Sequence, residues 1–134
     1  MLVDTGPIVA LITKSDQHHQ TATSIFATIK EPLTTTVACL TEALYFLGSA
    51  DGWRAQSTLW EIIRDDLIAI HNSRDASEFR ASKFMERFWD IPCDYADATL
   101  LVAAEELNER SILTFDKHFH AYRLTNGRAL DVRL

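Results

Sequence analysis

Several features that would set this chain apart from an ordinary globular protein are scarce or missing. Among its 134 residues there are two cysteines, too few for a disulfide framework. Cys39 and Cys93 lie in or beside apolar segments, so we expect both to be buried free thiols in a reducing cytoplasm. No apolar run approaches the roughly 20 residues that cross a membrane, and no signal-peptide pattern is evident. We therefore expect a cytoplasmic protein without a membrane span.

Positive charge is also in short supply. The chain carries 13 Lys and Arg residues against 19 Asp and Glu, a net charge of −6 at pH 7, which argues against a general nucleic-acid binder that works through a broad basic surface. It does not exclude an enzyme whose acidic site holds cations, because bound metal ions reverse the local charge. Repeats, low-complexity tracts and linkers are missing too, and a chain of this length is expected to form one domain over residues 1–134.

Short apolar segments alternate with helical patterns along the chain. This alternation predicts an α/β fold in which helices cover both faces of a parallel sheet. Gly48 to Gly52 is expected to break one long helical stretch. The predicted strands are residues 2–3, 33–36, 67–71, 111–114 and, as a possible edge strand, 129–134. The predicted helices are residues 7–12, 20–30, 37–47, 53–66, a helix capped by Asp75 that runs to about residue 89, and 94–104.

Two of these strands end in an aspartate. The chain begins MLVDTGPIVALI, so Asp4 follows the strand Leu2-Val3, and Pro7 marks the start of a helix. An aspartate there can simply cap the helix, but the strand before Asp116 repeats the arrangement. In open α/β sheets, ligands bind in the crevice beyond the carboxyl ends of the strands.

Two other carboxylates interrupt unusually apolar helices. In VACLTEALYFL only Thr41 and Glu42 are clearly polar, which predicts a helix buried on every side. Glu42 should then have a cation, a hydrogen-bond partner or a raised pKa, because an unpaired buried carboxylate is very costly. In DYADATLLVAA, Asp94 is expected to cap the helix, and Asp97 lies one turn further on the same face.

Four acids that converged could not all stay ionised without a counter-charge. Mg²⁺ or Mn²⁺, which prefer oxygen ligands, would supply it, and no Cys or His cluster has the spacing of a zinc site. A carboxylate-held dication suits phosphodiester hydrolysis, because it polarises the phosphoryl oxygen and activates a bound water.

Four segments in this order resemble the PIN-domain ribonucleases, and among them the VapC-type toxins. They are VDTGPIVAL, the glutamate of VACLTEALYFL, DYADATLLVAAEEL and ILTFDKHFHAYR, and they extend from Met1 to about Arg123. The resemblance implies a three-layer α/β/α fold with a parallel, roughly five-stranded sheet. It also implies a Mg²⁺- or Mn²⁺-dependent endoribonuclease, the toxin of a type II toxin–antitoxin pair, that cleaves RNA, is inhibited by a small antitoxin and forms a homodimer.

The resemblance also implies roles for individual residues. By position, the acids that bind metal are Asp4, Glu42, Asp97 and Asp116. Thr5 corresponds to a Ser or Thr of the family whose hydroxyl faces the site, and Asp94 to an acid that supports the metal ligands. Only Met1-Leu2-Val3 precede Asp4, fewer residues than family members often have, so the first strand is expected to be short.

Other protein classes share parts of this pattern. The Asp-Thr-Gly triplet occurs in aspartic proteases, in which two such loops share a proton, but this chain has one triplet and is rich in helices. A receiver-like phosphoacceptor domain is also an acidic α/β protein of this size, but it needs paired acids after its first strand, where Asp4 stands alone. An inactive PIN-fold binding module is the third alternative, and the presence of all four acids gives it no support.

Basic and aromatic residues elsewhere have ordinary structural explanations. Two polar groups are expected to form solvated faces in preference to RNA contacts; they are Lys117, His118, His120 and Arg123, and Arg80, Lys83 and Arg87. Aromatic side chains at helical spacing are expected to lie in the core or at a dimer face in preference to stacking on bases; they are Trp53, Trp60, Phe79, Phe84 and Phe88.

Overall fold

The structure, a computed structural model, describes residues 1–134. Its centre is a five-stranded parallel sheet with the strand order β3-β2-β1-β4-β5. The strands are β1 (Leu2–Val3), β2 (Thr34–Thr36), β3 (Ala69–His71), β4 (Ser111–Leu113) and β5 (Asp131–Arg133). The predicted parallel sheet, its strand number and the short first strand are confirmed.

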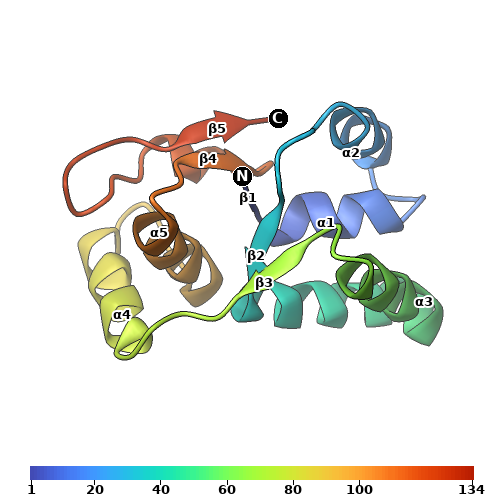
Figure 1. Cartoon of the computed structure of the whole chain (residues 1–134), viewed down its shortest axis with the longest axis horizontal. Helices are drawn as coiled ribbons and strands as arrows, with labels where there is room; N and C mark the ends of the chain where they lie inside the picture. Colours follow the sequence, from blue (N-terminus) through green and yellow to red (C-terminus); the bar gives the residue numbers. More distant parts are fainter.

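Helices cover both faces of this sheet. Figure 1 shows α1, α2 and α3 on one side and α4 and α5 on the other. The helices are α1 (Thr5–Ile12), α2 (His19–Phe26), α3 (Val37–Arg64), α4 (Ser77–Arg87) and α5 (Tyr95–Leu107), and a 3₁₀ turn η1 (Lys117–His120) follows β4. The three-layer α/β/α prediction is therefore correct. None of the helices combines the length and the apolar character that crossing a membrane requires.

The sheet separates two apolar cores. Successive side chains of a strand point to opposite faces, so Leu2 lies in the core under α4 and α5, and Val3 lies in the core under α1 and α3. Ile112 and Leu113 divide in the same way one strand away. Both cysteines are buried free thiols, as predicted.

The long helix α3 differs from its prediction in two ways. The predicted break is a kink inside one element, where Asp51 and Gly52 leave helical geometry and Gly52 takes a φ of +58°, a conformation that suits glycine. The first half is also not buried on every side, because Val37, Tyr45 and Phe46 are 52, 70 and 49% exposed. Its apolar composition therefore does not report complete burial.

Predictions for α2 and α4 also need correction. Helix α2 ends at Phe26, four residues before the predicted end. Asp75 does not cap α4: the residue before the helix is Ala76, in a left-handed conformation and without a side-chain cap. Phe79, in the first turn of α4, is exposed, whereas Phe84 and Phe88 are buried as predicted.

Candidate active site

The two strand-end aspartates lie at the same edge of the sheet. Strands β1 and β4 are neighbours, and the Asp4 amide donates to the Leu113 carbonyl over 3.0 Å. Asp4 is also the residue before α1, and its Oδ1 accepts from the Thr5 amide at 2.7 Å. Asp116 precedes η1 and accepts from the His118 amide at 2.9 Å. Each aspartate thus caps the element that follows it.

Thr114 connects these two aspartates. Its hydroxyl donates to Asp4 Oδ2 over 2.7 Å and accepts from the Asp116 amide at 2.9 Å. The side chain is completely buried, so this link is shielded from water. Thr114 is not among the site residues predicted from the sequence, although a polar residue at the end of the buried segment SILT is a signal that could have indicated it.

Thr5 brings Glu42 to the same place from α3. The Thr5 hydroxyl donates to Glu42 Oε1 over 3.1 Å, and it lies 3.4 Å from the Cys39 carbonyl. The amide of the same threonine binds Asp4, so one residue holds two acids. Burial, together with the charge of Asp94, raises the pKa of Glu42.

Asp97 is held at the start of α5. Its amide donates to Asp94 Oδ1 over 2.9 Å, and the Asp94 amide donates to Asp97 Oδ2 over 3.3 Å, which is a capping box. The Tyr122 hydroxyl lies 3.2 Å from the same Asp97 oxygen and also donates to the Pro92 carbonyl. Nothing in the local sequence around Tyr122 indicates this contact, which depends on the tertiary fold.

The pKa values show that these acids share one electrostatic environment. Burial raises the pKa of Asp4 to about 6; hydrogen bonds from Thr114 and Thr5 lower it, and the charges of Asp116 and Glu42 raise it.

The pKa of Asp97 responds to the same group of charges. Burial and then the charge of Asp94 raise it to about 7, with smaller contributions from Asp4 and Asp116. No Lys or Arg forms a salt bridge with any of these acids; the one basic neighbour is His118, whose Nδ1 lies 2.9 Å from Asp116 Oδ1.

The donor chemistry suits an oxygen-preferring dication. The acids offer carboxylate oxygens and have no Lys or Arg partner, the situation in which Mg²⁺ or Mn²⁺ is favoured. No group of three or more His, Cys, Asp or Glu side chains is arranged so that it could hold an ion. Much of the carboxylate hydrogen-bonding capacity is directed at the protein itself, at Thr5, Thr114 and Tyr122.

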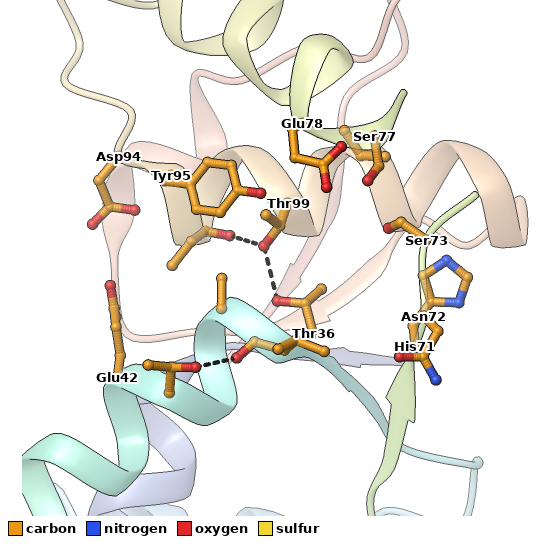
Figure 2. Close-up of a pocket in the computed structure, with 15 residues that line it drawn as sticks. Thr36, Glu42, His71, Asn72, Ser73, Ser77, Glu78, Asp94, Tyr95 and Thr99 are labelled. Carbon is orange, nitrogen blue, oxygen red and sulfur yellow. Dashed lines mark hydrogen bonds between the residues drawn. The ribbon is translucent and has the colours of Figure 1, made fainter. Parts of the chain in front are cut away.

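A cavity of about 740 Å³ opens beside the acids, and we call it the side pocket. Glu42 and Asp94 lie at one end of it, and Ser73 and Ser77 lie at the other (Figure 2). This cavity was not predictable from local sequence patterns, because it forms between the ends of β2 and β3 and the starts of α3, α4 and α5. Its lining is Thr36, Val37, Ala38, Thr41, Glu42, His71, Asn72, Ser73, Ser77, Glu78, Asp94, Tyr95, Ala96, Thr99 and Val102.

The basic group predicted on α4 is engaged within the protein. Arg80 forms ion pairs with Glu105 and Glu106 at 3.1 and 2.9 Å, and Arg87 donates to main-chain carbonyls at 3.3 Å. These contacts give Arg80 and Arg87 a structural role, but within the protein and not on the solvated face that the sequence predicted.

Comparisons with known proteins agree with this geometry. The family model described as "PIN domain" matches residues 1–124, and the chain belongs to the PIN-domain family. Among curated proteins it is similar to "Ribonuclease VapC26" of Mycobacterium tuberculosis (strain ATCC 25618 / H37Rv), with 23% identity over 128 residues and 95% of each chain covered. Among solved structures it is similar to the VapC20 toxin of Mycobacterium tuberculosis, described as "Sarcin-Ricin loop cleaving toxin".

The similarity to that structure has a TM-score of 0.79 and 22% identity, and it covers 86% of this chain and 88% of the other. It confirms the fold. The resemblance to VapC-type PIN domains that the sequence predicts is therefore confirmed.

Proposed function

We propose that this protein is a metal-dependent endoribonuclease that hydrolyses RNA phosphodiester bonds at the edge of the sheet where Asp4 and Asp116 lie. The observation that carries the proposal is the gathering of carboxylates from β1, α3, α5 and the end of β4 without a Lys or Arg partner. The family membership, and the descriptions of similar proteins as a ribonuclease and as a "Sarcin-Ricin loop cleaving toxin", support the same activity.

In this proposal the metal-binding acids are Asp4, Glu42, Asp97 and Asp116. A bound Mg²⁺ or Mn²⁺ would polarise the phosphoryl oxygen and lower the pKa of a water molecule. The rest of the site orients these acids through hydrogen bonds. The Thr5 amide binds Asp4 Oδ1, and the Thr114 hydroxyl binds Asp4 Oδ2. Asp94 holds Asp97 through the capping box.

The competing classes lack support in the structure. An aspartic protease is an all-β protein with two Asp-Thr-Gly loops, whereas this sheet is parallel and covered by helices. A receiver-like phosphoacceptor needs a lysine beside its acids, and no lysine pairs with them here. An inactive PIN-fold module would bind a partner without cleaving RNA, so the activity assay separates it from the main proposal.

The assay compares purified wild-type protein with Asp4→Asn and Asp97→Asn on a fluorescently labelled RNA. We expect cleavage that EDTA abolishes and Mn²⁺ or Mg²⁺ restores. Each variant should cleave at least about a hundredfold more slowly, because a charged metal ligand is lost, with an unchanged circular dichroism spectrum. Asp65→Asn, an exposed site at the end of α3, is the matched control. Wild-type rates in both active-site variants would contradict the proposal.

We further propose that the protein is the cytoplasmic toxin of a type II toxin–antitoxin pair and forms a homodimer. The surplus of uncompensated carboxylates favours a small antitoxin that places a basic segment over the site. Co-expression with the small open reading frame beside the gene should yield a stable complex without RNA cleavage. Light scattering should give the mass of a dimer, and recovery of a monomer with no small partner would count against this part.

A further inference from the structure

The side pocket contains polar groups that the fold does not use. At its floor, the Thr36 and Thr99 hydroxyls lie 2.8 Å apart, and Thr99 donates to the Ala96 carbonyl over 2.7 Å. The side chains of Ser73, Ser77 and Glu78, by contrast, form no hydrogen bond within the protein. Figure 2 shows these three residues on the side of the cavity away from Glu42 and Asp94. The two threonines at the floor are therefore hydrogen-bonded within the protein, whereas Ser73, Ser77 and Glu78 have polar atoms that could bind a ligand.

The charge of the lining restricts which part of an RNA can enter. Glu42, Glu78 and Asp94 contribute carboxylates, and the lining contains no Lys or Arg. His71 is already bound to Glu106, with its Nε2 2.6 Å from a carboxylate oxygen. A phosphate group is disfavoured by these charges. An uncharged ring with hydrogen-bond donors at its edge is favoured.

Tyr95 adds a flat apolar surface to this polar lining. The residue is 45% exposed, and its ring lies between the acid end of the cavity and Thr99 (Figure 2). Unstacked bases of single-stranded RNA are commonly held by an aromatic ring together with hydrogen bonds to the base edge. A carboxylate accepts from an exocyclic amino group, as Glu or Asp does from the amino group of cytosine.

We infer that the side pocket holds one nucleobase of the RNA, next to the phosphate that is cleaved, and favours a base with an exocyclic amino group. Tyr95 stacks on the base and Glu78 accepts from its amino group. The cavity, at about 740 Å³, is within the size range of small-molecule sites. The inference rests on the proposed function, because the acids at one end of the pocket define where the phosphate lies.

A binding experiment tests the pocket without relying on catalysis. Cytidine and uridine, which differ at the C4 amino or carbonyl group and carry no phosphate, are titrated into the ¹⁵N-labelled, metal-free protein. We expect cytidine to shift the backbone amides of residues 71–78 and 95–99 and to bind about tenfold more tightly than uridine. Absence of shifts at these amides with either nucleoside would overturn the inference, as would shifts caused only by an arginine-containing peptide, which would indicate a protein ligand.

Two variants test the hydrogen bond to Glu78 and the stacking on Tyr95 separately. Glu78→Gln should reduce the preference for cytidine over uridine to nearly one. Tyr95→Ala should weaken both nucleosides about tenfold and leave their ratio unchanged, because stacking does not depend on the base. Glu86→Gln, an exposed change on the same helix α4, is the control and should behave as wild type. An unchanged ratio in Glu78→Gln would contradict the assigned contact.

Cleavage provides the second readout. RNA oligonucleotides that differ only by C or U beside the cut should be cleaved with a wild-type preference for C in kcat/KM, and in Glu78→Gln the kcat/KM of the C substrate should fall to nearly that of the U substrate. If the wild type cleaves no RNA, the proposed function fails, but the nucleoside titration still tests whether the side pocket binds a nucleobase. If the wild type cleaves but Glu78→Gln has the same preference at every position, the inference fails and the proposed function stands.

Discussion

Replacing Asp4 with asparagine should stabilise the metal-free protein at high pH, although it removes an acid that we propose for metal binding. Burial raises the pKa of Asp4 from 3.8 to about 6. Each pKa unit corresponds to about 1.4 kcal/mol, so the ionised carboxylate lowers the free energy of unfolding by about 3 kcal/mol. Asparagine removes that charge, and its side-chain oxygen still caps α1 by accepting from the Thr5 amide.

The gain depends on pH in a defined direction. Because the folded-state pKa is the higher one, the folded protein binds the Asp4 proton more tightly than the unfolded chain does. Wild-type stability from this group is therefore fully present below about pH 4 and is lost as the pH rises through about 6. The Thr114 hydroxyl, 2.7 Å from Asp4 Oδ2, would face an amide nitrogen in the variant, which costs about 1 kcal/mol at all pH values.

The net expectation is a gain of about 2 kcal/mol for Asp4→Asn at pH 8 and a loss of about 1 kcal/mol at pH 4. For a chain of this size the gain corresponds to a rise in Tm of roughly 4–8 °C. Urea and thermal unfolding in EDTA at pH 4, 6 and 8 measure it, with Asp65→Asn as the control. Added Mg²⁺ should stabilise the wild type more than the variant. Equal destabilisation of Asp4→Asn at pH 4 and pH 8 would refute the reasoning.

Three further substitutions test the contacts around the site. Thr114→Val should raise the Asp4 pKa further, because the hydroxyl that lowers this pKa is lost, and it should slow RNA cleavage about tenfold. Rate–pH profiles measure both effects, and Thr114→Ser should restore the wild-type rate. Tyr122→Phe, which removes the hydroxyl that donates to the Pro92 carbonyl and lies 3.2 Å from Asp97 Oδ2, should lower the free energy of unfolding by about 1–2 kcal/mol in urea. Glu106→Gln should cost about 2–3 kcal/mol at pH 7, because this side chain is 3% exposed and paired with a histidine and an arginine. Its pKa is lowered in the fold, so this difference should shrink as the pH falls below about 4.

Local signals made much of the fold predictable. A β-branched or apolar segment that ends in or is followed at once by a capping residue defines β1 before Asp4 and β2 up to Thr36, and the structure has both caps. Asp94 caps α5 for the same reason. These predictions succeed because the hydrogen bonds that decide them join residues within three positions of each other. The strand-end position of Asp4 and Asp116 follows from the same local patterns.

Contacts between distant segments were not predictable from those patterns. Tyr122 reaches Asp97 from 25 positions away, and Thr114 reaches Asp4 from 110. The side pocket depends on how α4 is placed against α5, which no single segment encodes. The exposure of Tyr45 shows the same limit, because an apolar helix does not reveal which of its faces is covered.

The two interpretations of these acids, as the observed helix caps and as the proposed metal ligands, do not exclude each other. Asp4, Asp94 and Asp116 each accept a main-chain amide at the start of a helical element, and caps of this kind contribute about 1 kcal/mol each. The backbone amides hold each carboxylate in place without neutralising its negative charge. Replacement by alanine would remove cap and charge together and confuse lost folding with lost catalysis. Asparagine removes the charge and keeps the cap, so it is the substitution that isolates the role of these acids in the chemistry.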